Sequence, residues 1–146
     1  MFKQGPVPAI AHGIIEYVAA ILFIAAPFLF TFDEDAPKAL SIGVGVVILI
    51  IAASTSWRTG LISSIPVQAH VILDYVLAIF LIASPFLLGF TDDGTAAAFF
   101  IVLGVVHLML TIATRFVTDE PRAPIASNTA SAARAAARRS RSGWRS

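Results

Sequence analysis

Four apolar runs, each long enough to cross a lipid bilayer, dominate this chain. They lie near Ala9–Phe32, Ala39–Trp57, Val67–Phe90 and Ala96–Phe116. A membrane-spanning helix needs about 20 predominantly apolar residues, and each run meets that length. The connections between the runs are short and rich in turn residues, so consecutive helices are expected to be antiparallel neighbours. The sequence therefore predicts an all-α integral membrane protein that forms a four-helix bundle.

The composition supports a membrane protein and excludes several kinds of site. Of the 146 residues, 58% are hydrophobic and 13% are charged, whereas soluble domains carry about 25% charged residues. After four spanning helices, too little of the chain is left for a large soluble domain. The sequence contains no cysteine, which excludes disulfide bonds, thiolate metal sites and iron–sulfur clusters.

Positive charges are distributed unevenly between the two ends of the runs. Lys3, Arg58, Arg115 and the arginines of the C-terminal tail flank one side, whereas the other side carries only Lys38 among five acidic residues. Lysine and arginine accumulate on the cytoplasmic side of membrane proteins. Both termini are therefore predicted to be cytoplasmic.

The chain contains an internal duplication. Aligning residues 12–32 with residues 70–90, an offset of 58, gives identity at 12 of 21 positions, including a His, a Tyr and a Pro-Phe pair. An offset of 59 aligns Gly45 with Gly104 and Thr55 with Thr114. Each unit contains two helices, so the second copy enters the membrane in the same direction as the first, as a parallel repeat.

The duplication predicts five segments. They are an N-terminal segment 1–8, a first transmembrane hairpin 9–57, a cytoplasmic linker 58–66, a second transmembrane hairpin 67–117 and a basic Ala/Ser/Arg-rich cytoplasmic tail 118–146. The tail is predicted to be disordered.

Four arginines of the tail share one face if a helix forms there: Arg134, Arg138, Arg141 and Arg145. They are candidate contacts for anionic lipid headgroups, at about 1 kcal/mol for each arginine near the surface. A tail that only enforces the topology is the alternative. No nucleic acid partner is expected, because no folded domain accompanies these charges.

A short motif lies near the end of the first helix in each hairpin. It reads Ala26-Pro27-Phe28 in the first copy and Ser84-Pro85-Phe86 in the second. This resembles the SPW-repeat family of integral membrane proteins, in which a Ser-Pro-Trp motif lies in the first of two transmembrane helices. Phenylalanine replaces the tryptophan in both copies, and alanine replaces the first serine. The resemblance implies a membrane location and a repeated hairpin, but no established activity.

The two prolines have a physical consequence of their own. Neither can donate a backbone hydrogen bond, so the carbonyls of Phe23 and Leu81, four residues earlier, lose their helical donors. A kink is therefore predicted near the outer end of each helix. Membrane helices tolerate such a proline where neighbouring groups bond the freed carbonyl.

Five ionisable side chains lie within the apolar runs: His12, Glu16, His70, Asp74 and His107, with Tyr17 and Tyr75 beside the two acids. Such residues are costly inside a membrane and usually face the interior of a bundle. In each copy the histidine and the acid are four residues apart, which puts them on one helix face. At about 1.5 Å per residue, both acids and the third histidine lie about 12 Å from the cytoplasmic edge.

Small and polar residues form a matching stripe on each of the other two runs. One stripe comprises Gly104, His107, Thr111 and Thr114; the other comprises Ser41, Gly45, Ala52 and Ser56. Such stripes are typical of close helix contacts in membranes. All four helices are therefore expected to share an interior, although Ile48 occupies the position that matches His107.

Three interpretations of the polar cluster remain open. The side chains form structural hydrogen bonds between helices, a pathway for protons or ions, or a metal or haem site. The first favours a structural or interaction role with no cofactor. The other two favour a small proton-, ion- or metal-handling protein.

The expected surroundings are a lipid bilayer, in a prokaryotic cytoplasmic membrane, with a homo-oligomer as a further expectation. The sequence contains no Gly-rich phosphate loop, nucleophile elbow or zinc-protease motif, so no enzyme is predicted.

Overall fold

The computed structural model describes residues 5–116, and its framework is four long helices. These are α1 (Ala9–Leu29), α2 (Asp35–Ser54), α3 (Val67–Leu87) and α4 (Gly94–Ala113). All four are long and apolar enough to cross a membrane. The predicted all-α, four-helix membrane architecture is confirmed. The tail arginines predicted to contact lipid lie outside the described residues.

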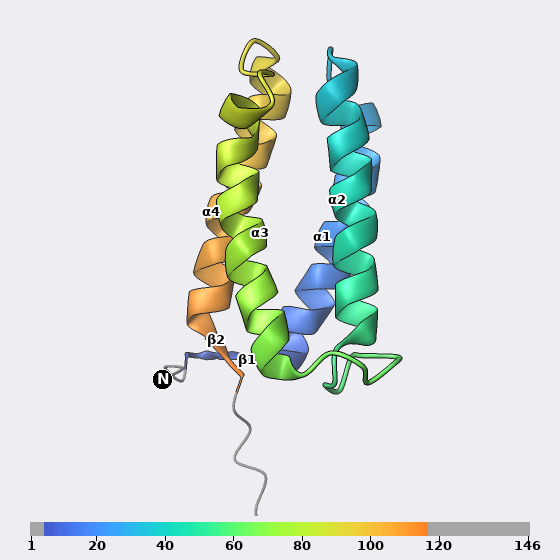
Figure 1. Ribbon diagram of the computed structural model, residues 1–146, viewed down its shortest axis with the longest axis vertical. Helices are drawn as coiled ribbons and strands as arrows, with labels where there is room; N and C mark the ends of the chain where they lie inside the picture. The colour runs from blue at the N-terminus through green and yellow to red at the C-terminus, as the bar shows by residue number, and fades with distance from the viewer. Residues whose placement is uncertain (1–4, 117–146) are drawn as a thin grey trace, which may run out of the picture.

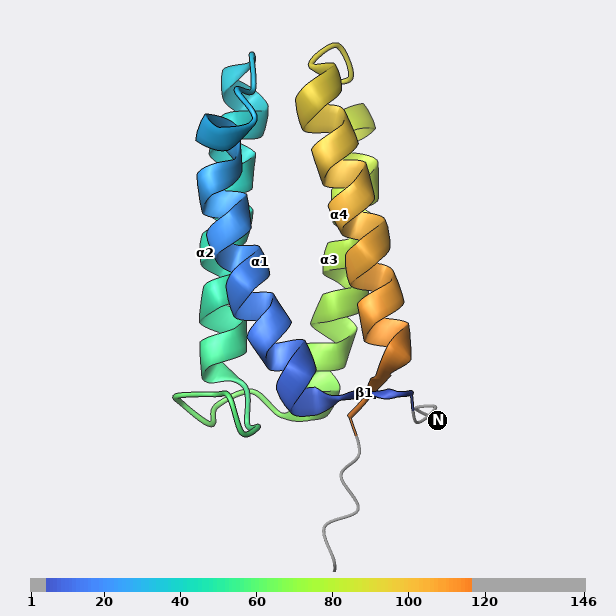
Figure 2. The ribbon, with the colours of Figure 1, turned by 180° about the vertical axis from the view of Figure 1, so that it is seen from behind.

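The helices form two antiparallel hairpins, α1–α2 and α3–α4, that meet at one end and diverge toward the other (Figure 1). The reverse view shows the same separation (Figure 2). We call the end where the hairpins meet the inner end, and the end with the α1–α2 and α3–α4 connections the outer end. Two short strands, β1 (Val7–Pro8) and β2 (Thr114–Arg115), pair in parallel at the inner end. They tie the chain before α1 to the end of α4.

Phenylalanine rings fill the interface between the hairpins in its outer half. Phe23 of α1 is buried, and its ring centroid lies 5.1 Å from that of Phe99 and 5.9 Å from that of Phe100, both on α4. Phe32, which follows α1, packs against both α4 rings, and Phe90, which follows α3, packs against Phe100. Edge-to-face pairs of this kind add about 0.5–1.5 kcal/mol each to the burial of apolar area. This aromatic core holds the diverging hairpins together.

Within each hairpin, one glycine allows the two helices to approach closely. A Cβ atom on Gly45 would lie 2.6 Å from the backbone oxygen of Ala20, and one on Gly104 would lie 3.0 Å from the backbone nitrogen of Ile82. The predicted stripe on α4 is buried throughout. On α2 the stripe is buried except at Ser56, where the prediction is wrong. The helix ends at Ser54, and the change of direction leaves Ser56 exposed.

Both α1 and α3 end two residues beyond their prolines, in the same conformation. The amide of Phe32 donates to the carbonyl of Pro27 at 3.2 Å, and that of Phe90 donates to the carbonyl of Pro85 at 3.0 Å. The preceding residues, Thr31 and Gly89, have φ values of 48° and 72°. A left-handed residue followed by this hydrogen bond is the Schellman ending of a helix. The duplication therefore extends to the backbone of the helix ends.

Serine hydroxyls bond the two carbonyls that the prolines leave free. Ser84 Oγ donates to the carbonyl of Leu81 at 2.9 Å within α3. The first copy has Ala26 at the matching position, and there Ser41 Oγ of α2 donates to the carbonyl of Phe23 at 2.6 Å. Different serines thus stabilise the same feature in the two copies, as the membrane environment requires.

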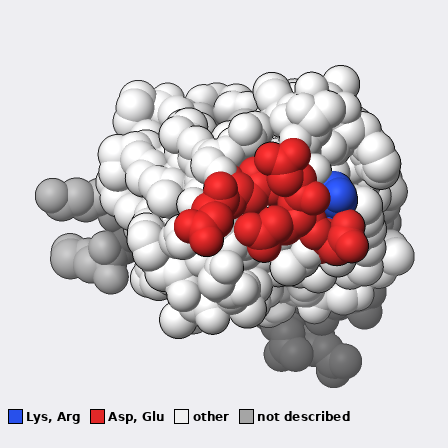
Figure 3. Space-filling view, turned by 90° about the horizontal axis from the view of Figure 1, so that it is seen from above, with Lys and Arg blue, Asp and Glu red and all other residues white. Residues whose placement is uncertain are grey.

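The outer end carries an acidic surface (Figure 3), and one acid there, Asp93, is buried. Asp93 caps α4, where its side chain accepts a hydrogen bond from the amide of Ala96. Asp93 Oδ2 also accepts from the amide of Asp33 at 2.7 Å and that of Glu34 at 3.2 Å, both in the other hairpin. Burial alone would raise the pKa of Asp93, but these amide hydrogen bonds hold the pKa below its ordinary value. Asp93 therefore joins the two hairpins at the outer end, and we call this set of hydrogen bonds the Asp93 latch.

Candidate functional site

The two His-acid pairs meet where α1 crosses α3, toward the inner end. His12 and Glu16 come from α1, and His70 and Asp74 come from α3. All four side chains are buried, with at most 2% of each residue exposed. The i, i+4 spacing places the members of each pair one turn apart on the helix face that meets the other hairpin. We call these four residues the quartet.

Each histidine of the quartet contacts both acids through Nε2. His12 Nε2 lies 3.4 Å from Glu16 Oε1 and 3.3 Å from Asp74 Oδ2. His70 Nε2 lies 3.2 Å from Glu16 Oε1 and 3.3 Å from Asp74 Oδ1. The four nitrogen–oxygen distances are nearly equal, so the quartet is close to two-fold symmetric.

Two threonines hold the other nitrogen of each histidine. His12 Nδ1 lies 2.8 Å from Thr114 Oγ1, and His70 Nδ1 lies 2.9 Å from Thr55 Oγ1. Each contact crosses from one hairpin to the other. The pairing was not predicted, although the offset of 59 that aligns the two threonines was a signal for it.

The threonines also determine where each histidine carries its proton. Thr55 Oγ1 donates to the carbonyl of Ile51 at 2.7 Å, and Thr114 Oγ1 donates to the carbonyl of Leu110 at 2.6 Å. A hydroxyl has one proton, so each threonine oxygen can only accept from the histidine. Both Nδ1 atoms therefore carry hydrogen, and a neutral ring presents the lone pair of Nε2 to the quartet.

The Nε2 atoms that face the acids are buried without a hydrogen bond. This holds for His12, His70 and His107 among the described residues. A charge-assisted N–H···O hydrogen bond is about 2.7–2.9 Å long, whereas the quartet contacts are 3.2–3.4 Å. Unpaired buried nitrogen is unfavourable, so the arrangement favours an additional bonded partner at the centre of the quartet.

His107 of α4 lies beside the quartet rather than within it. Its Nε2 atom is 3.7 Å from Asp74 Oδ1, and the residue is 8% exposed. The matching position in the first hairpin is Ile48, which belongs to the apolar core. His107 is thus the residue that breaks the two-fold symmetry of the site.

The two tyrosines do not join the quartet. Successive residues of a helix point about 100° apart, which turns each tyrosine away from the acid before it. Tyr75 is 37% exposed. Tyr17 donates its hydroxyl hydrogen to the carbonyl of Thr59 at 3.0 Å, which fastens the linker between the hairpins to α1.

Two aromatic rings cover the histidines on the inner side. The ring centroid of Trp57 lies 4.3 Å from that of His70 and 5.7 Å from that of His12. The Phe116 centroid lies 5.2 Å from that of His12. Neither ring was predicted as part of the site, because each follows a helix end and its position depends on the path of the chain after it.

A comparison with known protein families gives a match that covers nearly the whole helical region. The SPW repeat domain matches residues 10–114, which include the quartet and, apart from Ala9, all four helices. The chain belongs to the SPW repeat family. The family resemblance predicted from the proline motifs is therefore confirmed. The chain matches no curated protein and no solved structure.

The family motif lies apart from the quartet in this SPW-repeat protein. Pro27, Ser84 and Pro85 are buried near the outer ends of α1 and α3. Phe28 and Phe86 occupy the tryptophan positions, and they are 74% and 67% exposed. Phenylalanine lacks the polar ring atom that favours tryptophan and tyrosine at the membrane interface. The motif thus shapes the helix ends, whereas the ionisable groups gather toward the inner end.

Proposed function

We propose that this multi-pass membrane protein binds one divalent transition-metal ion between its two hairpins. The observation that carries the proposal is the quartet itself. One ligand atom from each of His12, Glu16, His70 and Asp74 lies within 4.8 Å of the others, and all four residues are buried.

The spacing of the quartet matches a tetrahedral ligand set. Zinc–nitrogen and zinc–oxygen bonds are about 2.0–2.2 Å, and a tetrahedron with such bonds has ligand atoms about 3.4 Å apart. The observed nitrogen–oxygen separations are 3.2–3.4 Å, measured to Glu16 Oε1 and to both oxygens of Asp74. One ligand atom from each residue would reach one ion after side-chain movements that bring the four atoms, now within 4.8 Å of one another, to the tetrahedral spacing.

Histidine chemistry supports the same conclusion. Metal-bound histidine normally donates its second ring N–H to a neighbouring acceptor, which fixes the ring orientation. Thr114 and Thr55 supply that acceptor for His12 and His70. The two rings are thus oriented for Nε2 to bind an ion.

Charge balance favours a divalent cation. Glu16 and Asp74, when ionised, bring two negative charges into a segment where uncompensated charge is costly. A divalent ion with two neutral histidines makes the quartet neutral. Structural hydrogen bonding, one of the interpretations from sequence, would instead require an added proton for each Nε2 contact, carried either by the carboxyl groups or by the rings.

The donor set favours zinc or a similar ion such as ferrous iron. Imidazole nitrogen suits these metals, whereas magnesium and calcium prefer sites made of oxygen ligands. The absence of cysteine from the sequence disfavours monovalent copper, which is selected by thiolate and thioether ligands. The bound ion would link α1 to α3 and so serve the assembly of the bundle as well.

The proposal includes a prokaryotic cytoplasmic membrane as the location, with both termini in the cytoplasm. The charge asymmetry of the sequence supports the orientation, because Arg58 and Arg115 flank the inner end and acidic residues flank the outer end. The small size of the protein and its family support the prokaryotic membrane.

The test measures metal content and cobalt spectra on the purified full-length protein in detergent. Wild type should contain about one ion per chain and develop the visible bands of tetrahedral cobalt, since the quartet offers four ligands. Glu16→Gln and Asp74→Asn, which preserve shape, should lose the ion. Asp93→Asn removes a buried carboxylate at the outer end and is the matched control; it should retain the ion.

Circular dichroism would verify that all variants keep their helices. A folded wild-type protein that takes up no zinc or cobalt would overturn the proposal and return the quartet to structural hydrogen bonding. Equal metal content in wild type and both quartet variants would also overturn it.

A further inference from the structure

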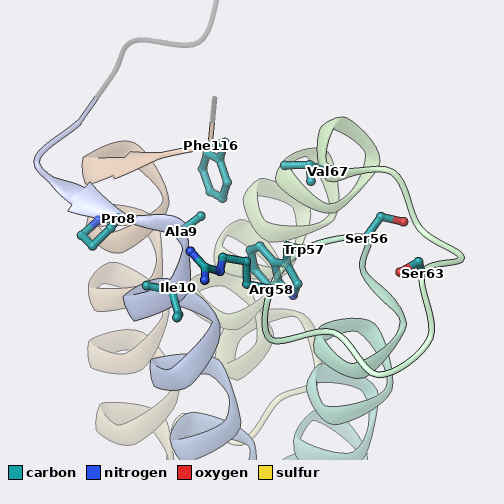
Figure 4. A pocket seen from close by; sticks show the side chains of 9 residues that line it. All are labelled: Pro8, Ala9, Ile10, Ser56, Trp57, Arg58, Ser63, Val67 and Phe116. Atoms are coloured by element: carbon teal, nitrogen blue, oxygen red, sulfur yellow. The ribbon is translucent and has the colours of Figure 1, made fainter. Parts of the chain in front are cut away.

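A pocket of about 570 Å³ opens at the inner end, on the far side of two aromatic rings from the quartet. Its lining includes Pro8 and Ile10 at the start of α1, Val67 at the start of α3, and Trp57, Arg58 and Phe116 from the segments that follow α2 and α4. Figure 4 shows these side chains around one space. The pocket thus draws on both hairpins, as the quartet does.

The rings of Trp57 and Phe116 separate this pocket from the histidines. Each ring lines the pocket and also lies against a quartet histidine, Trp57 against His70 at 4.3 Å and Phe116 against His12 at 5.2 Å. One layer of side chains therefore stands between the pocket and the histidine rings of the quartet.

The opposite approach to the quartet is closed by a much thicker layer. Ala20 and Ala78, one turn farther along α1 and α3 from the acids, are completely buried. Beyond them lies the aromatic core formed by Phe23, Phe99 and Phe100. The acidic surface of the outer end (Figure 3) lies on the far side of that core.

Trp57 lies outside the helices, at the mouth of the pocket. It lies after the end of α2, is only half-buried, and its indole Nε1 donates one hydrogen bond, to the carbonyl of Ala52 at 3.3 Å. Loop residues at the mouth of a site are the usual place for gating movements. By contrast, Phe23 and Phe100 of the aromatic core lie on helices and are buried.

Arg58 gives the pocket a positive charge. It lines the pocket and is exposed, and within residues 5–116 it forms no ion pair with an acid. A positive charge at a port repels a free cation and slows its arrival, by an amount that salt reduces.

We infer that this pocket is the port through which the metal ion reaches and leaves the quartet, with Trp57 as its gate and Arg58 as an electrostatic barrier. The inference rests on the proposed metal site. It adds the route to that site and the residues that control exchange.

The experiment follows cobalt binding by stopped-flow absorption, which does not depend on tryptophan fluorescence. Trp57→Leu should raise both the association and the dissociation rate constants by about tenfold or more, with little change in affinity, because a gate limits passage in both directions. Trp57→Phe should give an intermediate effect. Phe99→Leu, an aromatic substitution on the outer side of the quartet, is the matched control and should leave both rate constants unchanged.

A second pair of variants tests the barrier. Arg58→Gln should raise the association rate constant several-fold at low salt, and the difference from wild type should disappear near about 0.5 M salt, where screening is strong. Arg115→Gln removes an exposed arginine of the same end that does not line the pocket, and it should have a smaller effect.

The outcomes separate the two proposals. Wild type that binds no cobalt at equilibrium overturns the metal site itself. Cobalt binding with unchanged rate constants in both Trp57 variants, or with faster exchange in Phe99→Leu instead, overturns the port and leaves the metal site standing.

Discussion

Two threonine hydroxyls decide what the buried histidines can bind. Thr55 and Thr114 each give their only proton to a carbonyl of their own helix, so they accept from His70 and His12. With Nδ1 occupied in this way, Nε2 is the atom presented to the acids. Serine or threonine at a helix end is common, and its role here follows from the histidine that reaches it from the other hairpin.

The residue-scale prediction concerns these hydroxyls. Thr55→Val and Thr114→Val keep the side-chain shape but remove the acceptor for Nδ1, so each is expected to weaken zinc or cobalt affinity by about 10–100-fold. Competition with a coloured chelator would measure the affinity.

Thr111→Val is the matched control, because Thr111 Oγ1 also donates to a carbonyl of its own helix, that of His107, without contacting a quartet histidine. An equal loss of affinity in the control would show that the threonines affect the metal only through helix stability.

At the scale of the helices, each hairpin has one place where its two helices approach so closely that only glycine fits. The contact of α1 with α2 requires Gly45, and that of α3 with α4 requires Gly104. Both glycines lie on stripes that the sequence predicts, and the offset of 59 pairs them. The physical reason is local: helix periodicity places small residues on one face, and close packing in a membrane needs such a face.

Gly45→Val is expected to lower the free energy of unfolding by about 1–3 kcal/mol, the usual cost of overpacking. The added side chain would meet the backbone of Ala20 and the side chain of Ile24. Gly43→Val is a control in the same helix, because a Cβ atom on Gly43 meets nothing within 4 Å. Unfolding of the purified protein in mixed micelles would measure the difference. Equal destabilisation by the two substitutions would contradict the close contact.

At the scale of the whole molecule, different kinds of interaction join the two hairpins at the inner and outer ends. Toward the inner end the quartet and the two His–Thr contacts cross between them, and at the outer end Asp93 receives amide hydrogen bonds from Asp33 and Glu34. The aromatic core lies between. Of these contacts between the hairpins, only the quartet of histidines and acids was predicted as a site. Asp93 was not predicted, because the sequence does not distinguish a buried capping aspartate from an exposed one.

The Asp93 latch predicts a pH dependence of stability. Its pKa is lower in the folded state than the value of about 3.9 expected when unfolded. The stabilisation is therefore present above the unfolded pKa and is lost as the pH falls through the folded pKa. Asp93→Asn should be less stable than wild type near neutral pH, and the gap between the two should narrow below about pH 4.

Denaturation midpoints measured between neutral and acidic pH would give both curves. Asp92→Asn, at an exposed neighbour, should follow the wild-type curve. A gap between Asp93→Asn and wild type that stays constant at every pH would rule out the charged latch.

The sequence by itself determined the four spanning helices, the duplication and the family, because helix length, apolar periodicity and the recurrence of His12 and Glu16 as His70 and Asp74 are written in consecutive residues. The orientation of the termini stays a prediction.

The tertiary structure decided how the parts meet. It paired His12 with Thr114 and His70 with Thr55, placed Trp57 over the quartet, turned Tyr75 away from it and left Ser56 exposed. These features depend on the crossing of two hairpins and on the path of the chain beyond each helix end. Helix periodicity carries no information about either, since both arise from contacts between residues far apart in the sequence.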